Sequence, residues 1–154
     1  MLKKIMQTNK NKAAAVLRIA LGVVLFPHGA QKLLGWFGGF GFTGTMNYFT
    51  GTLHLPWIIA LLVILIEFFG ALMVITGTAT RVAALLIIIN FIGVILTAHL
   101  DNGFFINWLG NQKGEGYEYH LLIIGIASSL LISGAGALSV DGLMSKGKLS
   151  MPLR

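Results

Sequence analysis

The sequence contains no cysteine among its 154 residues, and this absence excludes several kinds of site. Disulfides, thiolate metal centres, iron–sulfur clusters and cysteine nucleophiles all require a thiol. Acidic residues are also scarce, with five Asp and Glu against eleven Lys and Arg. Any redox chemistry of this chain must therefore use a group that the protein binds.

Charge of either sign is sparse, because charged residues make up 10% of the chain and hydrophobic residues 56%. Soluble domains carry about 25% charged residues. The composition therefore predicts an integral membrane protein of one domain, residues 1–154, with the lipid bilayer as a partner. The net charge of +6 does not indicate nucleic-acid binding, since the basic residues gather near the chain ends.

Four apolar runs approach the roughly 20 residues that a helix needs to cross a bilayer. They cover residues 13–34, 55–76, 80–100 and 119–138. We therefore predict an all-α integral membrane fold, a bundle of four transmembrane helices followed by a cytoplasmic tail at 139–154. Met46, Phe49 and Leu53 recur at helical spacing, which predicts a short helix on the outer surface over residues 43–53.

The basic residues also predict the orientation of the spans, because Lys and Arg are retained on the cytoplasmic side. Most of them lie before the first run, at the start of the third or after the fourth, while the opposite side has only Lys32 and Lys113. We therefore expect both the N- and C-termini in the cytoplasm.

Gly39, Gly41 and Gly44 show the G-x-G-x-x-G spacing of a dinucleotide-binding loop. That motif binds a pyrophosphate where a β-strand leads into the glycines and a helix follows. Here a transmembrane helix precedes them, so we interpret the segment as an interfacial turn. No HExxH motif, paired metal spacing or serine nucleophile elbow occurs, and no metal site is expected. His28 and His120 have similar depths, but no haem motif accompanies them, so haem is not expected.

The first run carries a polar face, which is costly inside a membrane and usually points into the bundle. Arg18, His28 and Lys32 share this face with Gly22 and Gly29. The glycines predict that a neighbouring helix approaches closely. Arg18 fits a snorkelling anchor at the membrane surface better than a site residue, whereas Lys32 fits both roles equally.

Glu67 and Asn90 lie deep in the second and third runs. A helix that starts at Leu55 places Glu67 about 18 Å in, near the midplane of a core about 30 Å thick. Asn90 lies at about 15 Å and His28 at about 9 Å from the same face. Side chains on these helices lean toward one another, so we predict that Glu67 pairs with His28 or Asn90 before Arg18. His99 lies opposite Asn90 on the helical wheel, which favours an interfacial position.

Four segments of the chain resemble one family of membrane proteins. They read RIALGVVLFPHGAQKLLGWFGGFG, IEFFGALMVITGTATR, HLDNGFF followed by GYEY, and GAGALSVD. Together they resemble the DoxX family of small bacterial four-span membrane proteins over residues 18–141. The resemblance implies the bacterial cytoplasmic membrane, an oxidoreductase or a partner of a separate redox enzyme, and a role in sulfur or quinone metabolism or oxidative-stress defence. The family pattern marks Arg18, His28, Gly29, Lys32, Glu67, Asn102, Gly103, Tyr117 and Glu118, but not His120.

Two functional hypotheses follow from these residues. In the first, the chain is a quinone-linked redox subunit in which Glu67 and His28 are catalytic and exchange protons with a quinone-like ligand. The residues expected to bind the ligand are then Lys32, Asn90, Tyr117, Glu118 and Arg18. In the second, the chain is a noncatalytic scaffold, assembly partner or small-molecule carrier. Both hypotheses are compatible with a homo-oligomer of this chain.

Overall fold

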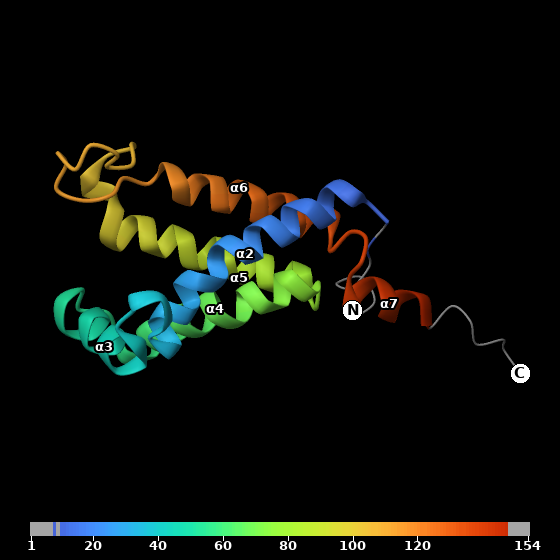
Figure 1. The fold of residues 1–154 in the computed structure, drawn as a ribbon, viewed down its shortest axis with the longest axis horizontal. Coiled ribbons are helices and arrows are strands. Elements are labelled where there is room, and N and C mark those ends of the chain that lie inside the picture. The colour runs from blue at the N-terminus through green and yellow to red at the C-terminus, as the bar shows by residue number, and fades with distance from the viewer. Residues whose placement is uncertain (1–7, 9, 148–154) are drawn as a thin grey trace, which may run out of the picture.

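The computed structural model describes residue 8 and residues 10–147, and within these residues all regular structure is helical. Four long helices run side by side along the molecule (Figure 1). Their bounds are α2 Lys12–Leu34, α4 Trp57–Thr76, α5 Thr80–Val94 and α6 Glu118–Ser133. A π-helix at Ile95–His99 and a 3-10 turn at Leu100–Asn102 extend α5. Helix α2 packs on α4 and α6, and α5 packs on the same two helices, which closes the bundle.

Three of these helical segments are long and apolar enough to cross a membrane. They are α2, α4 and the combined segment Thr80–Asn102. Helix α6 is apolar but has 16 residues and ends five residues earlier than the sequence predicts. It ends there because Gly134, at φ 80°, adopts a conformation that an α-helix cannot contain. The predicted all-α membrane bundle is confirmed, with a short fourth helix.

The predicted surface helix between the first two spans is present as two short pieces. Helix α3 covers Gly41–Asn47, and a π-helix continues it over Tyr48–Thr52. Met46 and Phe49 are buried in a cluster with Ala60 and Ile64 of α4. The pair of pieces therefore covers one end of the bundle, opposite the end where α7 (Val140–Gly147) lies (Figure 1).

Glycines set the distance between α2 and α4. A Cβ atom at Gly29 would lie 2.6 Å from the backbone of Phe68, and one at Gly22 would overlap Ile75. Real Cβ atoms do not approach other atoms so closely, so both positions require glycine in this packing. The predicted close approach along the polar face of α2 is therefore confirmed.

Arg18 is buried inside the bundle, with 1% of its surface exposed. Its guanidinium donates to the carbonyl oxygens of Val74 and Ile75 in the last turn of α4. It also donates to Ala135 and Leu138, in the segment after α6. The expectation of a snorkelling anchor was wrong, because the last carbonyls of a helix have no intrahelical partner and the five donors of arginine can satisfy them.

Helix α7 is held against the same end of the bundle by Asp141. The carboxylate, 1% exposed, accepts hydrogen bonds from the backbone N–H groups of Ala79 and Thr80 at the start of α5. Asp141 thus caps a helix whose first residue, Thr80, lies 61 residues earlier in the chain. Residues 140–147 are a docked helix where the sequence suggests a tail, and residues 148–154 lie outside the described part.

We expect Arg18→Met to destabilise the bundle strongly, because it leaves several buried carbonyl groups without donors. The loss in free energy of unfolding should be about 3 kcal/mol. Thermal denaturation of the purified protein in detergent measures it. Lys12→Met, which removes an exposed cation from the first turn of α2, is the matched control and should change little. Equal melting temperatures for the two variants would contradict the role assigned to Arg18.

Candidate functional site

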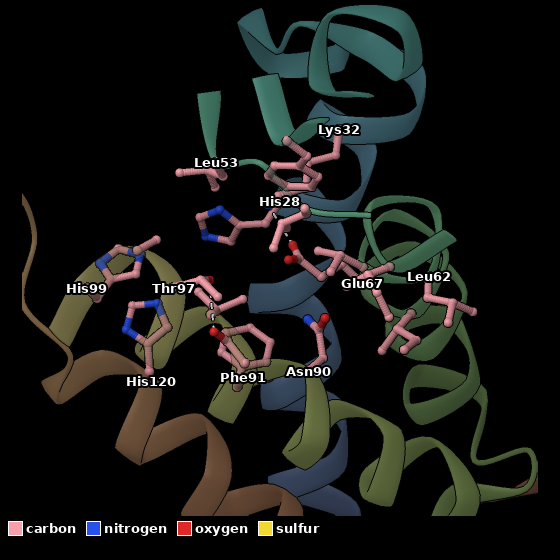
Figure 2. Close-up of a pocket in the computed structure, with 18 of the residues that line it drawn as sticks. His28, Lys32, Leu53, Leu62, Glu67, Asn90, Phe91, Thr97, His99 and His120 are labelled. Carbon is pink, nitrogen blue, oxygen red and sulfur yellow. Dashed lines mark hydrogen bonds and ion pairs between the residues drawn. The ribbon is translucent and has the colours of Figure 1, made fainter. Parts of the chain in front are cut away.

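A cavity of about 750 Å³ lies among α2, α4, α5, α6 and the surface helix. This volume is within the range of pockets that hold small molecules, roughly 300–1,000 Å³. Most of the walls are apolar, and polar side chains meet inside (Figure 2). The ionisable and amide groups that line it include His28, Lys32, Glu67, Asn90, His99, Tyr119 and His120. Four of the predicted site residues, His28, Lys32, Glu67 and Asn90, are therefore brought together.

The strongest polar contact in the cavity joins Lys32 to Glu67. The ammonium nitrogen lies 2.6 Å from Oε2 of the carboxylate. The side chain of Lys32 is 26% exposed and that of Glu67 is 5% exposed, so the carboxylate is the deeper partner. The predicted pairing of Glu67 with His28 or Asn90 was wrong. The side chain of Glu67 points toward the start of α4. Lys32, which lies one turn beyond His28 on α2, contacts it there.

His99 and His120 form a second polar group in the cavity, with ring centroids 4.2 Å apart. Nδ1 of His99 lies 2.8 Å from the carbonyl oxygen of Glu115. A carbonyl can only accept, so this nitrogen carries the proton and donates it. His120 is 7% exposed, and its ring also contacts Phe91 and Tyr119.

The interfacial position expected for His99 was wrong, because the helical wheel assumes an α-helix throughout. Residues 95–99 form a π-helix, in which each turn holds an extra residue. One extra residue rotates the following side chains by about 100° relative to an α-helix. His99 therefore turns from the membrane side toward the cavity.

Tyr117 and Glu118 do not line the cavity. The Tyr117 ring packs edge-on against Phe104 at 5.7 Å, and Oε1 of Glu118 accepts from the backbone N–H of Ile106 at 3.0 Å. Both residues hold the loop that precedes α6. The next two residues, Tyr119 and His120, line the cavity instead. Helix α6 begins at Glu118, and the position of this first residue sets the direction in which each following side chain points.

Asn102, which the family pattern marks, supports the cavity from outside. Its amide donates to the carbonyl oxygens of Ala98 and Glu115. The Glu115 carbonyl is the group that also accepts from His99, so Asn102 and His99 hold the same point of the loop. Arg18 lies at the other end of the bundle, where backbone carbonyls occupy its donors, and it does not line the cavity.

Three buried polar atoms on residues that line the cavity have no hydrogen-bond partner among the described residues. They are Nδ2 of Asn90, the hydroxyl of Tyr119 and Nδ1 of His120. A buried polar group without a partner costs about 1–3 kcal/mol. The site residues predicted from the sequence include neither Tyr119 nor His120: Tyr117 and Glu118 are named instead of Tyr119, and His120 is set aside. A ligand with matching polar atoms would offset the cost of all three.

No group of three or more His, Asp or Glu side chains within the described residues is arranged to hold a metal ion. The polar groups of the cavity instead suit an organic ligand. Asn90 offers a donor, Tyr119 offers a hydroxyl, and Lys32 offers a positive charge beside a carboxylate.

The model of the DoxX family matches residues 13–100, which include His28, Lys32, Glu67, Asn90 and His99. This chain belongs to the DoxX family. A protein of Bacillus subtilis (strain 168) named "Putative oxidoreductase CatD" is 32% identical over 133 residues, which cover 86% of this chain and 87% of that protein. No solved structure matches the chain significantly. Membership of DoxX and the three apolar helices place the protein in a membrane, and the relative's name fits a redox-related role.

We expect the Lys32–Glu67 pair to show energetic coupling in a double-mutant cycle. Lys32→Met should destabilise this DoxX protein more than Glu67→Gln does, because it leaves a buried carboxylate without its partner. The double variant should be more stable than the sum of the single effects predicts, by about 1 kcal/mol. Thermal denaturation in detergent gives the four values. Lys113→Met, on the exposed loop, controls for loss of positive charge, and additive effects would argue against the pair.

Proposed function

We propose that this DoxX protein is a quinone-linked redox subunit of the bacterial cytoplasmic membrane, and that the cavity binds a quinone-like ring. The observation that carries the proposal is a set of three buried polar atoms, on Asn90, Tyr119 and His120, that have no partner in the described part of the chain and lie on residues near the Lys32–Glu67 pair. These groups stand in a mostly apolar cavity large enough for an aromatic ring.

The lining suits a flat apolar ring that carries oxygen atoms at its edge. Asn90 and Tyr119 can donate hydrogen bonds to ring oxygens, and Lys32 can place its positive charge near one of them. Apolar walls such as Ile66, Phe91 and Val94 remove the faces of the ring from water. A strongly polar or charged metabolite would bury many polar atoms against these walls without partners.

Quinone chemistry also requires protons, since reduction of one quinone consumes two electrons and two protons. Glu67 is the group in the cavity that we assign to proton exchange, with Lys32 as its hydrogen-bonded partner at 2.6 Å and His28 beside them. The electrons come from, or pass to, a separate redox enzyme that acts as the partner. The rings of His99 and His120 lie between the cavity and the loop at Glu115, and we assign to these two imidazoles the exchange of protons with the outside.

The predicted orientation, with both termini in the cytoplasm, places the cavity in the outer half of the membrane. Protons would then exchange with the outer side through the loop of residues 103–117. Such a subunit would protect the cell under oxidative or quinone stress. The cavity would bind a reactive quinone from the membrane while the redox partner exchanges electrons with it.

Tyr119→Phe should weaken the binding of menadione, a tailless naphthoquinone, by about five- to tenfold, since it removes one buried donor. Titration of the purified protein in lipid nanodiscs measures the affinity. Tyr117→Phe is the matched control, because it makes the same change at the neighbouring tyrosine that packs on Phe104 outside the cavity. If Tyr117→Phe weakened binding and Tyr119→Phe did not, the ligand would lie elsewhere.

Glu67→Gln should leave menadione affinity within about twofold of the parent, because glutamine keeps the shape and a hydrogen bond. It should nevertheless abolish resistance to quinone stress in cells that depend on this protein, because glutamine cannot exchange a proton. Glu118→Gln, at the carboxylate that accepts from Ile106, is the control and should support growth. Full resistance with Glu67→Gln would remove Glu67 from the mechanism and favour a noncatalytic carrier or scaffold.

A further inference from the structure

One wall of the cavity is also part of the surface that faces the membrane. Ile59 and Leu62 of α4 line the cavity and are each 44% exposed, and Ile89 of α5 lines it and is 58% exposed. In a bundle that spans a membrane, exposed apolar side chains at this depth contact lipid chains. A wall made of residues that line the cavity and also contact lipid is where a lateral opening, between α4 and α5, would lie.

The path of the two helices explains this opening. Helices α4 and α5 are joined by the short connection of residues 77–79, and near that end a Cβ atom at Gly70 would lie 3.5 Å from Ile87. Farther along, side chains from both helices line the cavity, including Ile66 of α4 and Val94 of α5. The space between the helices is therefore filled near the connection and hollow toward the other end.

Gly93 makes the opening wider. It lines the cavity from α5, and a Cβ atom at this position would have no other atom of residues 8 and 10–147 within 4 Å. No strained backbone angle requires glycine there. A larger side chain at position 93 would therefore extend into the opening without disturbing the packing.

The pair His99 and His120 lies on the side of the cavity away from Leu62, one residue of the lipid-facing wall (Figure 2). In Figure 2, His99 and His120 lie on one side, and Leu62 lies on the far side beyond Glu67. A ligand that satisfies the polar groups thus has its oxygen-bearing ring toward the histidines and its other end toward α4 and α5. At that end the surroundings are aliphatic side chains and then the lipid.

We propose that the ligand is a membrane-resident quinone with a long isoprenoid tail, which enters from the bilayer between α4 and α5 and leaves its tail in this opening. The inference rests on the proposed function and specifies its substrate class. A ring with a long isoprenoid tail fills more space than a cavity of about 750 Å³ provides, so a closed cavity would limit the length of the tail. An opening lined by Ile59, Leu62 and Ile89 lets the tail remain among lipid chains.

The test compares two probes with the same ring, menadione and menaquinone-4, in nanodiscs, with affinities expressed per mole of lipid. The variants are Gly93→Phe and the matched control Gly125→Phe. Gly125 lies on α6, is exposed, does not line the cavity and also has no atom within 4 Å of a Cβ position. Gly93→Leu, with a smaller side chain, is the second variant if Gly93→Phe gives too little folded protein.

The parent and Gly125→Phe should bind the two quinones with affinities within about threefold of each other. Gly93→Phe should keep menadione within about threefold of the parent and lose at least about tenfold for menaquinone-4, and Gly93→Leu should show a smaller loss of the same kind.

Three results would overturn the lateral opening while leaving the proposed function standing. In the first, the parent binds menadione but excludes menaquinone-4. In the second, Gly93→Phe binds menaquinone-4 as the parent does. In the third, Gly93→Phe loses both quinones equally, which would place position 93 at the ring site. If the parent binds neither quinone, the proposed function itself fails, and the tailed substrate fails with it.

Discussion

The contact between α2 and α4 at Gly29 is the constraint on which the site depends. Because Gly29 has no side chain, the backbone of Glu67 and Phe68 lies directly against α2. This contact brings the carboxylate of Glu67 within reach of Lys32, one turn farther along α2. A larger residue at position 29 would push α4 away and separate the pair. The same glycine therefore sets the packing of two helices and the chemistry between them.

The buried polar groups at the two ends of the bundle differ in their hydrogen bonding. At the end that carries α7, Arg18 donates to carbonyl groups left over by α4 and by the segment after α6, and Asp141 caps α5. These contacts stabilise the fold and leave the groups that they join satisfied. At the other end, polar atoms of Asn90, Tyr119 and His120, which line the cavity, have no partner among the residues that the structure describes. Stability is concentrated at one end, and the capacity to bind a ligand at the other.

Both π-helices of the described residues border the cavity. Two π-helices, Tyr48–Thr52 and Ile95–His99, both contribute lining residues. Short π segments recur at functional sites in proteins, because the extra residue in the turn re-aims the side chains that follow. Here the second π-helix directs His99 toward His120. Lys32 and Glu67 lie on the regular α-helices α2 and α4. The site therefore combines residues from regular helices with a residue from a π-helix.

The sequence by itself determined the membrane fold and half of the site. Apolar runs of sufficient length dictate helices in lipid, because every backbone polar group must be satisfied within its own segment. Ionisable residues in such runs point inward, which was enough to place His28, Lys32, Glu67 and Asn90 in one cavity. Only the tertiary structure decided that Glu67 pairs with Lys32, that Arg18 binds carbonyl groups and that Tyr119 and His120 replace Tyr117 and Glu118. These outcomes depend on the rotation, spacing and exact start of each helix. They also depend on the π-helix at 95–99, which cannot be predicted by counting residues along a regular α-helix.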